Sequence, residues 1–378
     1  MAIGAGIQLP FLPLWLHARG LTVGEIAIVV AGMTAIRILA VPLAAFVSDR
    51  YQNRRSMIIV CGFAAFAAFL MLAFATSFWL IFSFSLLASF CWAPVFPLAE
   101  SFSVDGSTAH RIDYGRMRLW ASLSFLAGSL GGGILLQLLS INSVVFLMAG
   151  AQGISALVGL LLPDDPEIDA QVLKNQGPTN FARVVRFLMV GSFALFITAV
   201  GVGQASHAML YSFGPVHWHD LGFDKFTIGC FWAISIAAEV LLFGFSRNLV
   251  NRFGAINLII IGISGGAFRW LVMANDFGLG ITFGTQALHA ASFAMLHLGA
   301  MHYIRLNVRD GLRNSAQGLY AAMSGGVAMS AVMGLTGLLY EHLHGGTYLA
   351  MAGISLVALS FGLALKRLSP TSQALADT

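Results

Sequence analysis

The chain has 378 residues, of which 58% are hydrophobic and only 10% are charged, with a formal net charge of +4 and a mean hydropathy of +0.83. Soluble proteins are roughly 45–50% apolar and about 25% charged, so this composition excludes a soluble enzyme, a nucleic-acid binder and a disordered chain. The apolar stretches are long runs rather than alternating segments of about ten residues, which excludes an outer-membrane barrel. We predict an all-α membrane protein with twelve transmembrane helices.

Twelve apolar runs lie between charged or turn-rich breaks, and one bilayer crossing needs about 20 such residues. In the first half the predicted spans are 1–16, 24–48, 56–75, 78–101, 118–139 and 143–162. In the second half they are 187–213, 226–246, 255–274, 277–304, 315–339 and 346–365. The first span reaches only about 24 Å against roughly 30 Å of hydrocarbon, so we expect the native first helix to start upstream of Met1.

A polar stretch divides the spans into six plus six. We predict an N-terminal six-helix bundle at 1–163, a cytoplasmic linker at 164–185, and a C-terminal bundle with a short cytoplasmic tail at 186–378. The halves repeat at an offset of 202 residues: Phe11, Pro13, His17 and Gly20 recur as Phe213, Pro215, His219 and Gly222. Two like halves are typical of transporters that rock about a central binding site, so we expect two pseudo-symmetric bundles.

The basic residues fix an orientation. With the N-terminus in the cytoplasm, the inner loops and tail hold 16 lysines and arginines, whereas the outer loops hold only Arg19 and Lys225. The remaining two, Arg37 and Arg269, lie within spans. Cytoplasmic loops carry the excess of positive charge, so both termini are predicted to be cytoplasmic. For a bacterial protein this means the inner membrane.

Several motifs resemble those of a known transporter family. The stretch Asp49-Arg50-Tyr51-Gln52-Asn53-Arg54-Arg55 resembles the cytoplasmic loop signature of the major facilitator superfamily. The stretch from Asp113 to Ser122 resembles the phenylpropionate permease family, and more distantly the lactose permease (oligosaccharide:proton symporter) group. Phe268-Arg269-Trp270 and the pair Gln286 and His289 support the same resemblance. It implies the major facilitator fold.

The resemblance also implies roles for single residues. By the lactose permease pattern Glu100 is a substrate-binding carboxylate, Arg118 is its paired arginine, and Arg269 with His289 couples solute to proton. Two positions depart from the pattern. Ser292 replaces a proton-carrying glutamate, and the glutamate of span eight is displaced by one turn to Glu239. The cytoplasmic residues Asp49, Arg50, Asp113 and Arg116 are expected to latch the halves together and control gating.

The charged residues within the predicted spans include Arg37, Glu100, Glu239 and Arg269. An unpaired charge at membrane depth is costly, so these residues are expected to pair and to be functional. A carboxylate that changes its cationic neighbour as the helices rock would capture and release a proton. We therefore predict Glu239 as the leading proton carrier and Glu100 as the second. The alternative is a static salt bridge that specifies helix packing.

Polar and aromatic residues recur at helical spacing on several spans and are expected to face a wet cavity. The predicted solute-binding residues are Glu100, Arg118, Arg269, Gln286, His289, Trp92, Phe125, Gln204, His207 and Tyr211. His289 and His297, on the same face of span ten, are added to the proton path; buried histidines with a purely structural role are the alternative. Gly128 and Gly132 are interpreted as helix-packing residues. The chain has no Walker motif or metal-ligand spacing, so no cofactor is predicted.

Together these observations predict a monomeric, proton-coupled symporter that moves a small organic solute by alternating access, with the bilayer, the solute and protons as its partners and no nucleic acid. The resemblance favours an aromatic carboxylate such as 3-phenylpropionate. Three alternatives stay open: a proton symporter for sugars or nucleosides, a drug-efflux transporter, and a channel or non-transporting sensor.

Overall fold

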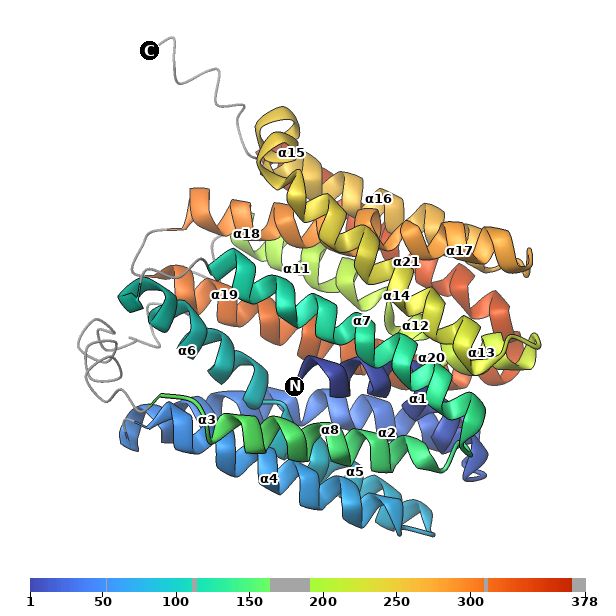
Figure 1. The fold of residues 1–378 in the computed structure, drawn as a ribbon. Coiled ribbons are helices and arrows are strands. Elements are labelled where there is room, and N and C mark those ends of the chain that lie inside the picture. Colours follow the sequence, from blue (N-terminus) through green and yellow to red (C-terminus); the bar gives the residue numbers. More distant parts are fainter. Residues whose placement is uncertain (52, 111–113, 164–190, 309–311, 369–378) are drawn as a thin grey trace, which may run out of the picture. The chain divides into compact units, whose positions relative to one another are not determined.

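The computed structural model describes residues 1–51, 53–110, 114–163, 191–308 and 312–368, and every regular element in these ranges is a helix (Figure 1). The chain divides into two compact units. The first unit comprises the described parts of Met1–Pro178, Leu210–Ala233 and Met333–Glu341, and the second those of Thr179–Met209, Ile234–Val332 and His342–Thr378. The predicted linker at 164–185 lies outside the described residues.

The first half of the chain, which belongs to the first unit, supplies eight described helices. They are α1 (Ala2–Ala18), α2 (Val23–Ala35), α3 (Arg37–Tyr51), α4 (Arg54–Ala73), α5 (Phe78–Trp92), α6 (Val95–His110), α7 (Tyr114–Leu138) and α8 (Ser143–Gly159). The same unit contains α13 (Gly214–Asp220) and parts of α12 (Ala208–Ser212), α14 (Lys225–Gly244) and α20 (Ala328–Leu343).

The second unit contains the rest of those three helices and the remaining elements of the second half. They are α11 (Gly191–Ala205), α15 (Ser246–Phe253), α16 (Ala255–Met273), α17 (Leu279–Ala287), α18 (Leu296–Asn307), α19 (Arg313–Ala322) and α21 (Thr347–Leu368). Two segments are π-helical, η1 (Ala290–Met295) and η3 (Met323–Val327), and η4 (His344–Gly346) is a single 3₁₀ turn.

Within the described residues, eight helical stretches are long and apolar enough to cross a membrane, and the last of them, Ser315–Leu368, is 54 residues long. Ala2–Ala18 and Ser143–Gly159 are apolar but shorter. Large apolar side chains lie on the surface, as Trp79 does at 71% exposure, while the guanidinium side chain of Arg269 is fully buried. Apolar side chains outside and polar groups inside suit a lipid solvent. The number of twelve spans stays a prediction.

The first unit is held together by helices that approach each other through glycine. α1 packs along α7 and α8, and α4 packs along α5 and α8. A Cβ atom on Gly128 of α7 would collide with the carbonyl oxygen of Ile3, and one on Gly6 of α1 would collide with that of Phe125. Gly132 faces the side chains of α1. The predicted packing role of Gly128 and Gly132 is therefore confirmed.

Gly128→Ala should destabilise the protein by about 1–3 kcal/mol, because the added methyl group forces α1 and α7 apart. Thermal unfolding of the detergent-purified protein measures this loss. Gly131→Ala is the matched control, since nothing lies within 4 Å of a Cβ at that position and alanine favours the helix over glycine. Equal melting temperatures for both variants would contradict the close contact at Gly128.

The repeat at an offset of 202 residues also appears in the local backbone of the first unit. α1 ends at Ala18 and α13 ends at Asp220, while α2 begins at Val23 and α14 begins at Lys225. Gly20 and Gly222 both have a positive φ, of 80° and 90°, which favours glycine at these two helix ends. The two loops are therefore alike in their helix boundaries and in their glycine conformation.

Side-chain caps start the helices that follow these loops. Thr22 and Glu25 form a reciprocal capping box at the start of α2. At the start of α14 the carboxylate of Asp224 accepts hydrogen bonds from the backbone N–H of Thr227 and from the side chain of Gln137, both at 2.7 Å. These bonds lower the pKa of Asp224 below its ordinary value of 3.8, and the bond from the Thr227 backbone has the largest effect.

Asp224→Ala should cost about 1 kcal/mol at neutral pH, the usual effect of losing a helix cap. Because the pKa of Asp224 is lower in the folded state, its contribution is complete above its unfolded value of 3.8 and is lost as the pH falls through the folded value. Asp224→Asn keeps a capping oxygen that does not titrate. The melting temperature of the parent should therefore fall relative to that of Asp224→Asn as the pH drops from about 5 to 3; a constant difference would contradict this role.

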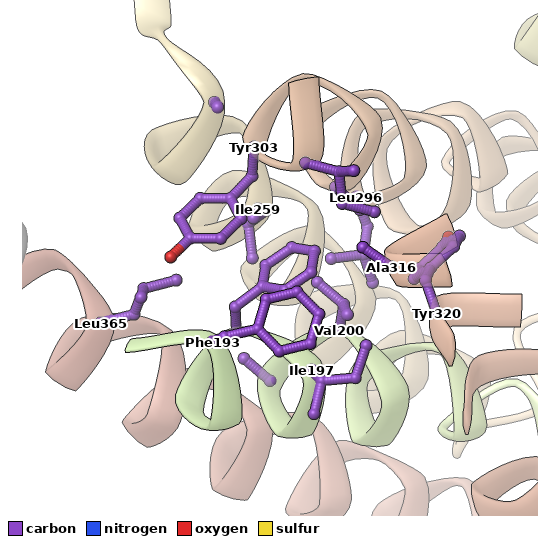
Figure 2. Packing of buried hydrophobic residues seen from close by; sticks show 14 of the residues in the cluster. Phe193, Ile197, Val200, Ile259, Leu296, Tyr303, Ala316, Tyr320 and Leu365 are labelled. Atoms are coloured by element: carbon purple, nitrogen blue, oxygen red, sulfur yellow. The ribbon is translucent and has the colours of Figure 1, made fainter. Parts of the chain in front are cut away.

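The core of the second unit lies among α11, α16, α18 and α21 (Figure 2). Phe196 of α11 stacks on Tyr303 of α18 with ring centroids 4.2 Å apart, and both side chains are buried. Ile259 of α16 and Leu365 of α21 belong to the same cluster. This core fixes α11, α16 and α18 against one another, and these helices carry the polar residues described below.

Several spans that the sequence predicts as continuous are interrupted. The stretch 24–48 is divided into α2 and α3 at Ile36, and 78–101 is divided into α5 and α6 at Ala93 and Pro94. Pro94 has no N–H to donate, which explains the second break. In 187–213 the helix is interrupted at Ser206 and His207. There the Ser206 hydroxyl donates a hydrogen bond to the carbonyl oxygen of Gly203 and competes with the backbone N–H that would bond to it in a regular helix.

Candidate functional site

Arg269 occupies a buried position on α16 in the second unit. The helix approaches η1 and α18 closely because small residues line its face: a Cβ on Gly262 would lie 2.6 Å from the backbone nitrogen of Leu296. A Cβ on Gly265 would lie 3.1 Å from the Cβ atom of Ala291. The short distance between backbones lets the long side chain of Arg269 reach residues around η1. Its guanidinium carbon also lies 4.8 Å from the ring centroid of Trp270.

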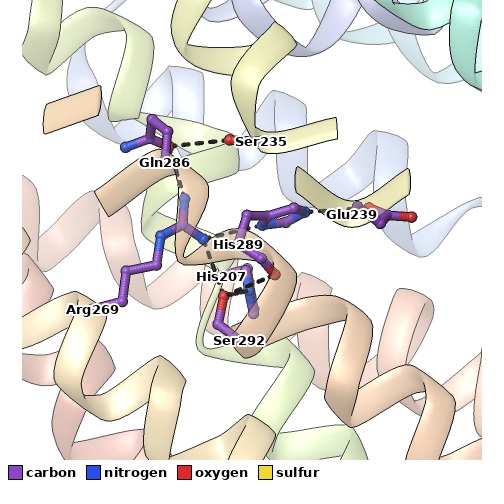
Figure 3. Close-up of polar contacts among 7 residues, drawn as sticks. All are labelled: His207, Ser235, Glu239, Arg269, Gln286, His289 and Ser292. Carbon is purple, nitrogen blue, oxygen red and sulfur yellow. Dashed lines mark hydrogen bonds and ion pairs between the residues drawn. The ribbon is translucent and has the colours of Figure 1, made fainter. Parts of the chain in front are cut away.

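The guanidinium group donates to three neutral acceptors (Figure 3). Nη2 lies 2.7 Å from Oε1 of Gln286, while Nη1 lies 3.0 Å from Nδ1 of His289 and 3.2 Å from Oγ of Ser292. All four side chains are buried. Arg269, Gln286, His289 and Ser292 are called the arginine network below. A fixed, planar set of donors at membrane depth can bind a carboxylate through two parallel hydrogen bonds.

The arginine fixes the tautomer of His289. Arginine can only donate, so Nδ1 of His289 must accept and the ring proton of the neutral imidazole lies on Nε2. That nitrogen points toward Glu239 of α14, whose Oε2 lies 3.7 Å away (Figure 3). His289 is thus placed between a cation and a carboxylate. A proton on Nδ1 and the hydrogen bond from Arg269 exclude each other.

Ser292 extends the network to His207. The serine hydroxyl accepts from Arg269 and lies 3.2 Å from Nε2 of His207, to which it can donate. Nδ1 of His207 lies 3.1 Å from the carbonyl oxygen of Gln204, an acceptor, and therefore carries the proton. Arg269 therefore sets the tautomer of His289, and the Gln204 carbonyl sets that of His207, which joins the network through Ser292.

Three parallel rings follow the arginine network along the same helix face, and His289, Phe293 and His297 are called the ring ladder. Phe293 stacks on His289 with centroids 5.0 Å apart and an interplanar angle of 11°, and on His297 at 6.1 Å and 9°. Nδ1 of His297 lies 2.9 Å from the hydroxyl of Tyr320 on α19. η1 lies inside the ladder, and π-helical segments often occur at functional sites.

In the first unit, Glu100 of α6 and Arg118 of α7 form an ion pair at 3.0 Å. Arg118 lies over the ring of Phe96, 5.3 Å from its centroid, and 49% of its side chain is exposed. Pairing of Glu100 with Arg118 agrees with what the resemblance implies. Arg37, at the start of α3, has an exposed side chain, and its pairing with another intramembrane charge stays a prediction.

Three other expected solute contacts, Trp92, Phe125 and Tyr211, belong to the first unit. Trp92 ends α5, before the break, so it does not share one continuous helix with Phe96 and Glu100; it packs edge-on against Phe69. In the same unit Tyr211 stacks on Trp232 at 5.8 Å, and Phe125 of α7 contacts Gly6 of α1 through its carbonyl oxygen. These three residues pack against neighbouring helices, and their contact with solute stays a prediction.

Of the expected gating residues, Arg50 lies in the last turn of α3 and is exposed. Asp113 lies outside the described residues, and the side chains of Asp49 and Arg116 are not among those described. Within the described ranges, no three histidine, cysteine, aspartate or glutamate side chains are grouped so that they could hold a metal ion.

Some members of the site were not among the predicted site residues. Ser292 donates and accepts at the centre of the arginine network, and Tyr320 bonds to His297. Ser235 of α14 lies 3.5 Å from Oε1 of Gln286. Ser292 follows His289 by three residues, so the helical face could have indicated it. Tyr320 lies on another span, and no sequence pattern relates it to His297.

The fold and these buried polar residues define a class, the multi-pass helical membrane proteins. The chain is similar in fold to the nucleoside transporter NupG, with a TM-score of 0.80 and 19% identity over 97% of this chain and 96% of that one. It is also similar to a D-xylose-proton symporter, with a TM-score of 0.73 and 16% identity over 96% and 94% of the two chains.

Sequence comparison defines the family. Residues 3–350 match the model of the MFS_1 like family, so the chain belongs to it. It is 28% identical to a "probable 3-phenylpropionic acid transporter" of Escherichia coli K12, over 94% of this chain and 92% of that protein. It is 24% identical to a maltose permease of Geobacillus stearothermophilus, over 85% and 80% of the two chains. The protein is therefore a secondary transporter of a small solute and not an enzyme.

Proposed function

We propose that the protein is a proton-coupled symporter that carries a small aromatic carboxylate, such as 3-phenylpropionate, across the bacterial inner membrane. It acts as a monomer with both termini in the cytoplasm. Two pseudo-symmetric six-helix bundles, 1–163 and 186–378, alternate access to the solute, and Asp49, Arg50, Asp113 and Arg116 control the cytoplasmic gate. The nature of the solute is supported by the 28% identical relative and by the chemistry of the arginine network.

The observation that carries the proposal is the position of His289 between Arg269 and Glu239. While Arg269 donates to Nδ1, His289 cannot take up a proton there. A solute carboxylate offers Arg269 two better, charged acceptors and draws the guanidinium group away from the histidine. Nδ1 then becomes available, and the resulting imidazolium faces the carboxylate of Glu239.

Proton and carboxylate therefore favour each other's binding. By linkage, if the solute anion increases the proton affinity of His289 and Glu239, the proton increases the affinity for the anion by the same factor. Such a pair is transported together, which is symport. Ring surfaces of Trp270 and Phe293 lie beside the arginine network, where they can hold the aromatic part of the solute.

The test is transport by proteoliposomes with an imposed proton gradient. Labelled 3-phenylpropionate should be concentrated inside, and a protonophore should reduce the accumulation to equilibrium. Maltose and uridine serve as parallel substrates, because the relatives and fold neighbours include a maltose permease and a nucleoside transporter. Proton-driven uptake of either one without uptake of the acid would replace this proposal with the sugar or nucleoside alternative. Accumulation of the acid that the protonophore does not reduce would refute the proposed coupling to protons.

A further inference from the structure

A second group of polar side chains lies at the far end of the ring ladder, and the proposed function does not use it. Gln204 of α11 is only 3% exposed, and neither atom of its side-chain amide makes a well-formed hydrogen bond within 3.5 Å to the described residues. An unsatisfied buried amide costs about 1–3 kcal/mol, so its retention needs an explanation. Its backbone carbonyl already bonds to His207, which ties this residue to the arginine network.

Gln204 lies next to two further polar groups. Its side chain approaches the hydroxyl of Tyr320, which itself lies 2.9 Å from Nδ1 of His297. One turn before Gln204, Gly201 contacts Met323 at the start of η3, and this contact holds α11 against the segment that follows Tyr320. An amide, a phenol and an imidazole from three helices therefore meet where the ladder ends at His297.

From these contacts we infer that Gln204, Tyr320 and His297 form a hydroxyl subsite, which binds a polar substituent on the aromatic ring of the transported acid. The preferred solutes are then ring-hydroxylated arylpropionates or arylacrylates rather than the unsubstituted acid. The inference rests on the proposed function, since it takes the carboxylate of the same solute to be bound by Arg269.

The chemistry of the three groups fits a phenol. A phenolic hydroxyl both donates and accepts, and the Gln204 amide offers one acceptor oxygen and two donor hydrogens. The ring ladder sets the separation, because its successive centroid distances of 5.0 and 6.1 Å lead from His289, beside Arg269, to His297. With bonds of about 1.5 Å, a para-hydroxylated arylpropionate reaches about 8 Å from its carboxylate carbon to its phenolic oxygen. The two centroid steps add up to about 11 Å, and a hydrogen bond of about 2.9 Å at each end of the solute extends its reach to about 14 Å, which is enough to join Arg269 to the hydroxyl subsite.

Specificity follows from the cost of leaving the subsite empty. A site built to hydrogen-bond a hydroxyl discriminates strongly against the analogue that lacks it, because its buried polar groups then stay unpaired. The purified parent should bind 3-(4-hydroxyphenyl)propionate at least tenfold more tightly than 3-phenylpropionate in a competition assay. Gln204→Leu should abolish this preference by weakening only the hydroxylated acid, and 3-phenylpropionate should bind within about threefold of the parent.

Two controls keep the result specific. Gln152→Leu makes the same change at another buried amide, on α8 of the first unit, and should leave both affinities unchanged. If Gln204→Leu does not fold, Tyr320→Phe keeps the ring and removes only the hydroxyl. Tyr303→Phe is its matched control, because Tyr303 is also buried and lies outside the proposed subsite.

The outcomes separate this inference from the proposed function. The hydroxyl subsite would be overturned if the parent bound the two acids with equal affinity. It would also be overturned if Gln204→Leu and Tyr320→Phe weakened the binding of both acids equally. Either result would leave the proposal of a carboxylate symporter standing. Binding of neither acid would overturn the proposed function and the subsite with it.

Discussion

Arg269→Gln should lower the affinity for an aromatic carboxylate by about 30-fold or more, since it removes hydrogen bonds to a charged group that are worth about 1.5–3 kcal/mol. Glutamine keeps a polar side chain beside Gln286 and His289 but carries no charge. Arg269→Lys should recover only part of the affinity, because an ammonium group cannot form the two parallel hydrogen bonds of a guanidinium. Isothermal titration or a competition assay on purified protein measures both effects.

The matched ligand for this experiment is the methyl ester of the same acid. It retains the ring and loses the negative charge, so its affinity should differ little between the parent and Arg269→Gln. Arg252→Gln is the protein control, because Arg252 is an exposed cation on α15. An unchanged dissociation constant for the acid in Arg269→Gln would remove Arg269 from the solute site.

Glu239→Gln should abolish proton-driven accumulation while exchange of solute across the membrane continues. Its amide has nearly the size of the carboxylate and can keep the same place beside Nε2 of His289. It carries no charge, however, and cannot stabilise the imidazolium that forms when a proton binds. In proteoliposomes with an imposed pH gradient, the ratio of internal to external solute should fall to about one. Counterflow of labelled against unlabelled solute should remain within a few-fold of the parent.

Glu25→Gln is the control for Glu239→Gln, because Glu25 is an exposed carboxylate in the capping box of α2. It should accumulate solute as the parent does. If Glu239→Gln concentrates solute equally well, the proton is carried elsewhere. Glu100, which pairs with Arg118, is then the carboxylate to test next.

Much of the fold follows from the sequence because the rules for a lipid solvent are simple. Apolar runs of the required length gave helices close to the predicted ranges, and the repeat at an offset of 202 residues anticipated matching helix ends at Ala18 and Asp220. The breaks at Ile36 and at Ser206 were not anticipated. Hydropathy averages over a window and does not register one side-chain hydroxyl that competes with the backbone.

The site was predictable where its members share one helix face. The spacing of Gln286, His289, Phe293 and His297 placed them on a common side, and the structure brings the first two to Arg269 and stacks the last three. Contacts between helices could not be derived in this way. The bonds from Ser292 to His207 and from Tyr320 to His297 depend on packing distances that residue spacing within one helix does not contain.

The π-helical winding of η1 determines the alignment of the three rings that surround it. In a regular α-helix, side chains four residues apart drift by about 40° around the axis, so that two such steps would turn the third ring well away from the first. The wider turn of a π-helix reverses part of this drift. Loss of one residue between Ala290 and Met295 would restore regular winding, and because the wide turn takes up one extra residue, His289 before it and His297 after it would keep their directions while Phe293 within it would turn. A single-codon deletion in this turn should thus move the middle ring out of line and leave both histidines in place.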